Sequence, residues 1–156
     1  MDINDYLLAQ DGIDWNDVLS DWTWLLPKEF TLWLVNRFGD LFITLPDGSI
    51  QMLDLGAGTL ETLADSQDSF CDLIDQDDND KDWLMIPLVD ECMANGLVLG
   101  NSQCYSYKLA PALGGEYNFE NTEVCDISVH YSIFGQVHKQ IKDVPDGTTV
   151  SFKIKD

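Results

Sequence analysis

The first forty residues carry apolar side chains at intervals of three and four, which is the spacing of an amphipathic helix. Asn4 and Asp14 are placed to cap two helices, and Pro27 fits the first turn of a third. The pattern therefore predicts helices from Asn4 to Gln10, from Asp14 to Trp22, and from Pro27 to Phe38, where Gly39 follows.

Apolar and polar residues alternate after Gly39, as they do in a half-buried strand. Residues 40–45 and 49–54 are predicted strands, and Pro46-Asp47-Gly48 between them is a typical turn, so the segment predicts a β-hairpin. After a second turn at Gly56-Ala57-Gly58, the expected helices are one capped by Thr59 through Ala64 and one capped by Ser66 through Ile74.

The second half of the chain is predicted to contain helices followed by strands. Residues 75–82 are too polar to be buried, and a helix around Pro87 to Met93 is expected to end at Asn95-Gly96. The further elements are strands at 105–109, 122–129 and 148–154, and a helix at 130–141 in which Gly135 costs about 1 kcal/mol relative to Ala. This order predicts one α+β domain over residues 1–156, with N-terminal helices first and helices packed against a mostly antiparallel sheet.

The charge of the chain narrows the choice of partners. There are 28 acidic and 8 basic residues, a formal net charge of −20, and residues 1–104 carry −18 of it. Such a field repels nucleic acid and anionic membranes and attracts basic proteins, so the expected partner is a basic protein. The alternative is that the acidity only keeps the chain soluble. The oligomeric state is left open.

Cysteine usage and hydropathy predict a cytoplasmic protein with reduced thiols and no membrane span. The acidic start has neither the basic region nor the apolar run of a signal peptide, and no stretch approaches 18 apolar residues. Cys71, Cys92, Cys104 and Cys125 form no C-x-x-C pair, and Cys71 is expected to fill the core because it lies in an apolar helical pattern.

No metal or cofactor is predicted. An EF-hand loop starting at Asp75 would have Asp77 and Asn79 in place, but Asp80 replaces the turn glycine and Ile86 the bidentate Glu. The cysteines are too widely spaced for a zinc site, and His130 and His138 are eight residues apart. We expect His130 to bond to backbone at a strand end and His138 to lie on the surface of a helix near Asp143.

The chain is predicted not to be an enzyme, because it has no G-x-S-x-G elbow and no clear nucleophile with a base. Cys125, Asp126 and His130 are close in sequence, but Cys125 and His130 have opposite parity on the expected strand. Gly56-Ala57-Gly58-Thr59 lacks the Lys of a phosphate-binding loop and is better explained as a capped turn.

A second possibility is a small-molecule site or a cryptic enzyme around the paired glycines of the 113–117 loop. Loops shaped by glycine often carry function. The residues that would line this site are Tyr107, Gly114, Gly115, Glu116 and His130.

Short motifs in a fixed order resemble a bacterial family of uncharacterised domains that is also found as the C-terminal part of type VI secretion DNase immunity proteins. The matching stretches, which run from about Leu26 to Ile141, are Asn36–Phe42, Leu53–Leu60, Asp82–Leu84, Cys104–Lys108, Leu113–Tyr117, Val129–Tyr131 and Val137–Gln140. The segment from Gly39 to Phe70 is also similar, more loosely, to the SUKH-type immunity superfamily, which implies an α+β fold.

The resemblance implies an immunity protein that binds and blocks a cognate toxin nuclease, and it brings no catalytic residues. An acidic inhibitor can cover the basic surface with which a nuclease holds phosphate. The predicted contact residues are Asp75, Asp77, Asp78, Asp80 and Asp82, with Trp83 either as an aromatic anchor or as a core residue.

Overall fold

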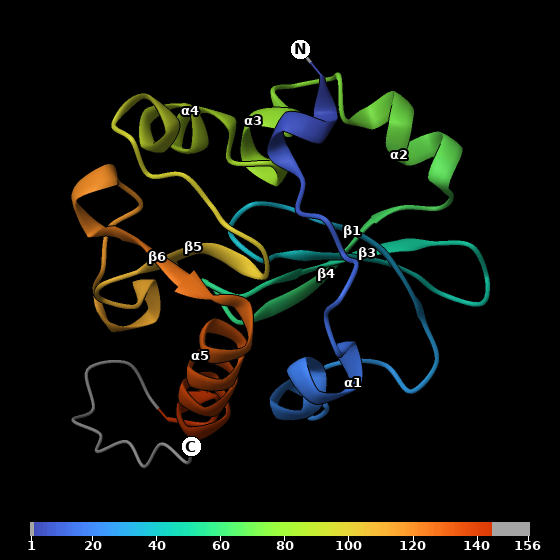
Figure 1. The fold of residues 1–156 in the computed structure, drawn as a ribbon. Helices are drawn as coiled ribbons and strands as arrows, with labels where there is room; N and C mark the ends of the chain where they lie inside the picture. Colours follow the sequence, from blue (N-terminus) through green and yellow to red (C-terminus); the bar gives the residue numbers. More distant parts are fainter. Residues whose placement is uncertain (1, 145–156) are drawn as a thin grey trace.

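The computed structural model describes residues 2–144, shown in Figure 1. Its helices are η1 (Ile3–Tyr6), α1 (Trp15–Val18), η2 (Leu19–Trp22), α2 (Gln67–Leu73), α3 (Asn79–Trp83), α4 (Ile86–Ala94), η3 (Pro111–Leu113), η4 (Phe119–Asn121) and α5 (Ile127–Ile141). Its strands are β1 (Thr31–Val35), β2 (Leu41–Thr44), β3 (Ile50–Asp54), β4 (Thr59–Ala64), β5 (Gln103–Tyr107) and β6 (Thr122–Asp126). The predicted α+β class with antiparallel strands is confirmed.

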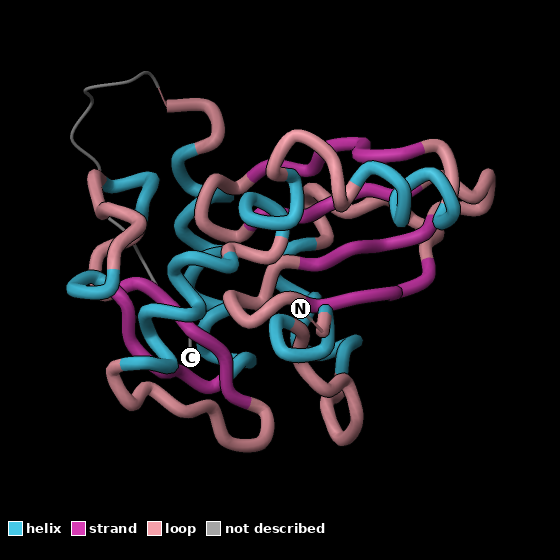
Figure 2. The backbone as a smooth tube through the Cα atoms, turned by 90° about the horizontal axis from the view of Figure 1, so that it is seen from above, coloured by secondary structure: helices cyan, strands magenta, loops and turns pink. Residues whose placement is uncertain are grey.

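The strands form two separate antiparallel sheets, one with the order β1-β2-β3-β4 and one made of β5 and β6. Figure 2 shows these sheets as two groups of strands. The predicted hairpin is β2–β3, in which Phe42 pairs with Met52. Its turn is closed locally, because Asp47 accepts hydrogen bonds from both the backbone N–H and the hydroxyl of Ser49.

The predicted third N-terminal helix is wrong, because Thr31–Val35 is strand β1. Its aromatic and branched residues suit a pleated surface as well as a helix, and pairing with β2 decides between the two. A β-bulge between Leu32 and Leu34 shifts the register, so that Trp33 and Leu34 both pack on the same side of the sheet. Because of this bulge, the apolar residues of β1 follow one another in the sequence at a spacing that is also typical of a helix.

The helix predicted after Thr59 is also wrong, because Thr59–Ala64 is strand β4, paired with β3. The turn before it is as expected, with the Asp54 side chain accepting from the Ala57 N–H. The first predicted helix shrinks to η1, which Asp2 caps, because Leu7 leaves it to form a β-bridge with Asn36.

Two of the predicted helix caps, those at Asp14 and Ser66, are confirmed. Asp14 accepts from Asp17 N–H at the start of α1, and Ser66 accepts from Ser69 N–H at the start of α2. Helix α4 also lies where it was predicted. No helix within the described residues is long and apolar enough to cross a membrane.

The four-stranded sheet separates two hydrophobic cores, because alternate side chains of each strand point to opposite faces. Leu41, Ile43 and Leu53 pack with residues of η2, α4, β5 and α5, whereas Phe42 and Met52 pack with α2 and the end of α3. Figure 1 accordingly shows α2 and α3 on one side of the sheet and α1 and α5 on the other.

Helix α5 begins earlier than predicted and takes over the end of the expected strand 122–129. Gly135 lies in its middle because η2 approaches closely: an added Cβ would lie 2.6 Å from the backbone oxygen of Asp21 and 3.0 Å from the indole nitrogen of Trp22. The close packing of η2 on α5 therefore explains why a glycine stands at this position, although glycine weakens the helix locally. The predicted strand at 148–154 lies outside the described residues.

Candidate partner-binding surface

The acidic residues of the middle of the chain gather on the segment from α2 to α4. Between residues 65 and 91 there are ten Asp and Glu residues and a single base, Lys81. All of the ten are exposed except Asp80, which is partly exposed. We call this segment, residues 65–91, the acidic segment.

Helices α2 and α3, a left-handed turn between them and the start of α4 build the acidic segment. The undersides of the helices bury Phe70, Ile74 and Leu84 against the sheet, which leaves the polar residues outside. Asp77 and Asp78 between the helices have φ angles of +51° and +60°. Asp and Asn adopt this left-handed conformation more readily than most residues, so the turn chemistry explains part of the acidic run.

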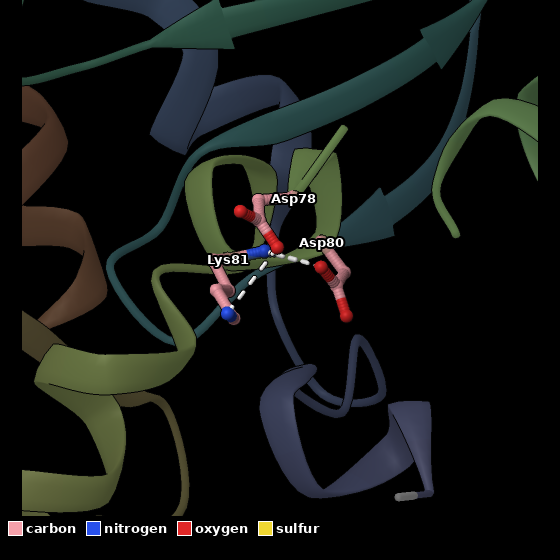
Figure 3. Close-up of polar contacts among 3 residues, drawn as sticks. All are labelled: Asp78, Asp80 and Lys81. Carbon is pink, nitrogen blue, oxygen red and sulfur yellow. Dashed lines mark hydrogen bonds and ion pairs between the residues drawn. The ribbon is translucent and has the colours of Figure 1, made fainter. Parts of the chain in front are cut away.

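One ion pair forms within the acidic segment, and Figure 3 shows it. The ammonium group of Lys81 lies 3.2 Å from the Asp78 carboxylate, and the backbone N–H of Lys81 donates to Asp80 at 2.9 Å. More than half of each charged side chain of the pair is exposed, and such pairs contribute roughly 0–1 kcal/mol. Lys81 balances one of ten acids, so the segment keeps a strongly negative potential.

Trp83 lies at the edge of the core rather than free on the surface. Its ring stacks on Phe70 with 5.1 Å between the centroids, and its backbone oxygen accepts from the Asn36 amide at 2.9 Å. The side chain remains partly exposed. Trp83 therefore supports α3 on the sheet, and part of its side chain stays accessible to a partner.

A cavity of about 410 Å³ lies beside the acidic segment. Met85, Leu88 and Met52 supply apolar wall, and the polar residues that line it are Asp40, Asp54, Lys81, Asp82 and Tyr117. A cavity with apolar walls and several carboxylates has the chemistry to hold the stem and the charged head of a Lys or Arg side chain.

Asp40 is the buried member of this cavity, with 3% of its surface exposed. Its carboxylate accepts from the Leu55 N–H and from the Asn36 amide, both at 2.9 Å. Burial and then the charge of Asp54 raise the pKa of Asp40 well above its ordinary value. Burial and the same two carboxylates raise the pKa of Tyr117 to about 12. Three acidic residues and one basic residue, Lys81, therefore line the cavity, so an added positive charge would be favourable there.

The acidic segment lies within a region that matches a known family. Residues 64–138, which are 75 of the 156 residues, match the family model described as T6SS immunity protein Tdi1, C-terminal. This segment is similar to the Tdi1 C-terminal family. The predicted family resemblance is thereby confirmed, while a search of the curated proteins found no match.

The matched segment, residues 64–138, also contains all five residues of the alternative small-molecule site, but the structure does not bring them to one cavity. Tyr107 and His130 are buried, whereas Gly114 and Glu116 are exposed on a surface loop. Gly115 packs directly against the backbone of Leu109, and an added Cβ would lie 1.8 Å from the Leu109 oxygen. None of the five lines the cavity beside the acidic segment.

His130 is a structural residue of α5 rather than a strand-end residue. Its Nε2 lies 3.0 Å from the Phe38 oxygen and its Nδ1 2.7 Å from the Ser106 hydroxyl. A carbonyl only accepts, so Nε2 carries the proton and Nδ1 accepts from Ser106. Burial lowers the pKa of His130 to about 4, which keeps the ring neutral at pH 7.

Two further predictions from the sequence were wrong. His138 is buried, not on the surface, and its Nε2 lies 2.8 Å from the Leu55 oxygen. Cys71 is exposed and does not fill the core, because the outer face of the short helix α2 carries it. Cys125 lies opposite Cys104 in the register of the β5–β6 ladder, and both thiols are free. Burial raises the pKa of the Cys125 thiol, which disfavours the nucleophilic thiolate.

Asn36 and Asp40 are two buried polar residues that sequence reasoning missed. The Asn36 side-chain oxygen accepts from the backbone N–H groups of Phe38 and Asp40, and its amide bonds to Asp40 and Trp83. An Asn and an Asp flanking a glycine before a strand is the local signal that indicates such a turn.

Proposed function

We propose that this chain is a non-enzymatic immunity protein of type VI secretion that binds a toxin protein with a basic surface, such as a nuclease, and neutralises it. The observation that carries the proposal is the coincidence of two features. The residues that match the Tdi1 C-terminal family include the acidic segment, which contains ten acidic residues and one basic residue.

Electrostatics supports the choice of a nuclease as the toxin. A protein that grips nucleic acid contacts phosphates with Lys and Arg, and these residues are repelled by other cations and attracted by carboxylates. The acidic segment offers Asp75, Asp77, Asp78 and Asp82 in exposed positions and Asp80 in a partly exposed one. Long-range attraction of this kind accelerates association and depends on salt.

The cavity beside the acidic segment supports a specific contact in addition to the general attraction. One basic side chain of the toxin would place its aliphatic stem on Met85 and Leu88 and its charge near Asp54 and Asp82. Such a buried anchor surrounded by a charged rim is how most interfaces concentrate their binding energy. A toxin that attacks DNA would be met in the cytoplasm, and we propose that location for the chain.

Capture followed by reconstitution tests the proposal. The tagged chain is used to recover partners from lysate of its own source at low and at moderate salt, and the partners are identified by mass spectrometry. Each recovered protein is then produced alone and assayed for cleavage of plasmid DNA with and without this chain. The proposed function predicts a basic nuclease whose recovery weakens with salt and whose activity is lost at a one-to-one ratio. If the recovered partners have no toxic activity, or keep it in the complex, the proposal is wrong.

A further inference from the structure

Arg37 is the only arginine of the chain, and within residues 2–144 it forms no ion pair, although the protein has 28 acids. Its Nε atom is buried and, within the described residues, has no hydrogen-bond partner. The ion pairs found in the described part of the chain involve lysines only. A buried guanidinium donor without an acceptor costs free energy, so neither an ion pair nor a hydrogen bond of its Nε holds the Arg37 side chain within the described residues.

The backbone around Arg37 is held firmly in place. Asn36 fixes the bend that follows it by accepting from Phe38 and Asp40 N–H groups. The Arg37 oxygen accepts from the Tyr105 N–H at 2.8 Å, which ties the bend to β5. The guanidinium therefore starts from a rigid point, as a residue that recognises a ligand does.

Arg37 lines a cavity of about 550 Å³ between the N-terminal loop and the loop before β5. The two loops are anchored, because the Leu8 N–H donates to Val35 and the Gly100 N–H donates to the Gln103 side chain, both at 2.8 Å. None of the acidic segment lines this cavity. Its volume is in the range of small-molecule sites.

The lining of the cavity defines the chemistry of its ligand. Leu8, Ile13 and Leu99 form apolar wall, and Arg37 adds to the lining a guanidinium group, whose planar donors match a carboxylate. Asp11 also lines the cavity and forms no ion pair with Arg37, so the two opposite charges are available to separate groups of one molecule.

We propose that this cavity binds a small zwitterion, an amino acid with an apolar side chain, whose carboxylate bonds to Arg37 and whose ammonium group faces Asp11. The apolar side chain lies against Leu8, Ile13 and Leu99. The site is separate from the proposed toxin-binding surface, and it stands whether or not the chain is an immunity protein.

Nuclear magnetic resonance tests the site directly, because a single arginine gives a single side-chain Nε–Hε signal. The ¹⁵N-labelled chain is titrated with L-leucine, with 4-methylpentanoate, which lacks the amino group, and with L-leucinamide, which lacks the carboxylate. We expect saturable movement of the Arg37 signal with L-leucine at about 1 mM, since a ligand of this size reaches about that affinity. We expect weaker binding of 4-methylpentanoate and no effect of L-leucinamide.

Two variants assign the contacts. Arg37→Lys keeps the charge without the planar donor pair, and it should weaken L-leucine binding about tenfold or more, followed through the backbone signals of Gly100 and Ser102. Asp11→Asn should remove the preference for L-leucine over 4-methylpentanoate. The proposal is overturned if neither carboxylate moves the Arg37 signal, or if L-leucinamide moves it equally. This comparison uses the unaltered protein and holds even if a variant fails to fold.

Discussion

The two faces of the four-stranded sheet are covered in different ways. On one face, α5 and η2 are tied to the rest of the chain by buried polar groups: Trp22 donates to the Tyr131 oxygen, and His130 and His138 bond to backbone oxygens 92 and 83 residues away. On the other face, the short helices α2 and α3 are held by an aromatic cluster that includes Phe42, Phe70 and Trp83.

The difference indicates a division of tasks between the two faces. On the α5 face, the polar side chains of Trp22, His130 and His138 are buried. Each bonds to a backbone oxygen, and these bonds determine how the helix lies. The α2–α3 face keeps its charges outside, where they contribute little to stability and remain free to meet a partner. Substitutions should therefore change stability on one face and association on the other.

The largest effect is expected at the bend that connects the faces. Asn36→Ala removes hydrogen bonds to Phe38, Asp40 and Trp83 and leaves the buried Asp40 carboxylate with one partner fewer. We expect a loss of about 3–5 kcal/mol in the free energy of unfolding, measured by urea denaturation. Asn95→Ala, which changes an exposed asparagine, is the matched control and should cost less than about 1 kcal/mol. Equal losses would show that the bend has no special role.

Acid should weaken the α5 face through His130. Its pKa in the folded protein is about 4, below the ordinary 6.5, so the unfolded chain takes up the proton first as the pH falls. The stabilisation is complete above pH 6.5 and is lost as the pH drops toward 4, by up to about 3 kcal/mol.

Denaturation of the wild type and of His130→Asn between pH 7 and 4.5 measures this contribution. The variant should show the smaller dependence on pH, while protonation of the exposed acids affects both proteins alike. A titration of the His130 ring signal with a midpoint near 6.5 would contradict the expected burial.

A smaller loss is expected where α5 touches η2. Gly135→Ala improves the intrinsic helix propensity by about 1 kcal/mol, but the added methyl group meets Asp21 and Trp22. Overpacking should dominate and reduce the free energy of unfolding by about 1–3 kcal/mol in urea denaturation. Ser128→Ala, on the exposed side of the same helix, should change it by no more than about 0.5 kcal/mol. A more stable Gly135→Ala protein would show that the contact relaxes easily.

The smallest energetic effect concerns the α2–α3 face and appears in association alone. Replacing Asp75, Asp77, Asp78, Asp80 and Asp82 by Asn should slow association with a basic toxin about tenfold at low salt and flatten its salt dependence. Asn suits the left-handed positions 77 and 78, so the fold should be retained.

The matched control neutralises five exposed acids elsewhere, leaving the same net charge: Asp5→Asn, Asp17→Asn, Glu29→Gln, Glu120→Gln and Glu123→Gln. Stopped-flow or surface-based kinetics compare the two proteins. An equal reduction in both would mean that net charge, rather than the acidic segment, drives the encounter.

Local chemistry allowed much of the fold to be predicted. The β2–β3 hairpin, the caps at Asp14 and Ser66, and α4 follow from residues that lie within a few positions of one another. The acidic segment is exposed as expected, because unpaired carboxylates are too costly to bury.

Tertiary pairing decided the remaining elements. Thr31–Val35 and Thr59–Ala64 are short segments whose apolar spacing fits a helix or a strand, and they became strands because the β2–β3 hairpin offered two open edges. The family match and the acidic composition direct attention to residues 65–91, while the two cavities, only one of which lies beside these residues, are lined by residues far apart in sequence.

The sequence by itself determined the α+β class, the hairpin and the negative charge of this protein, since these depend on composition and on neighbouring residues. The tertiary structure alone decided that His138 is buried, that Gly135 admits η2, that Asp40 is enclosed and that Arg37 faces a cavity. The physical reason is that burial and hydrogen-bond satisfaction depend on partners from 15 to more than 100 positions away, which no local pattern specifies.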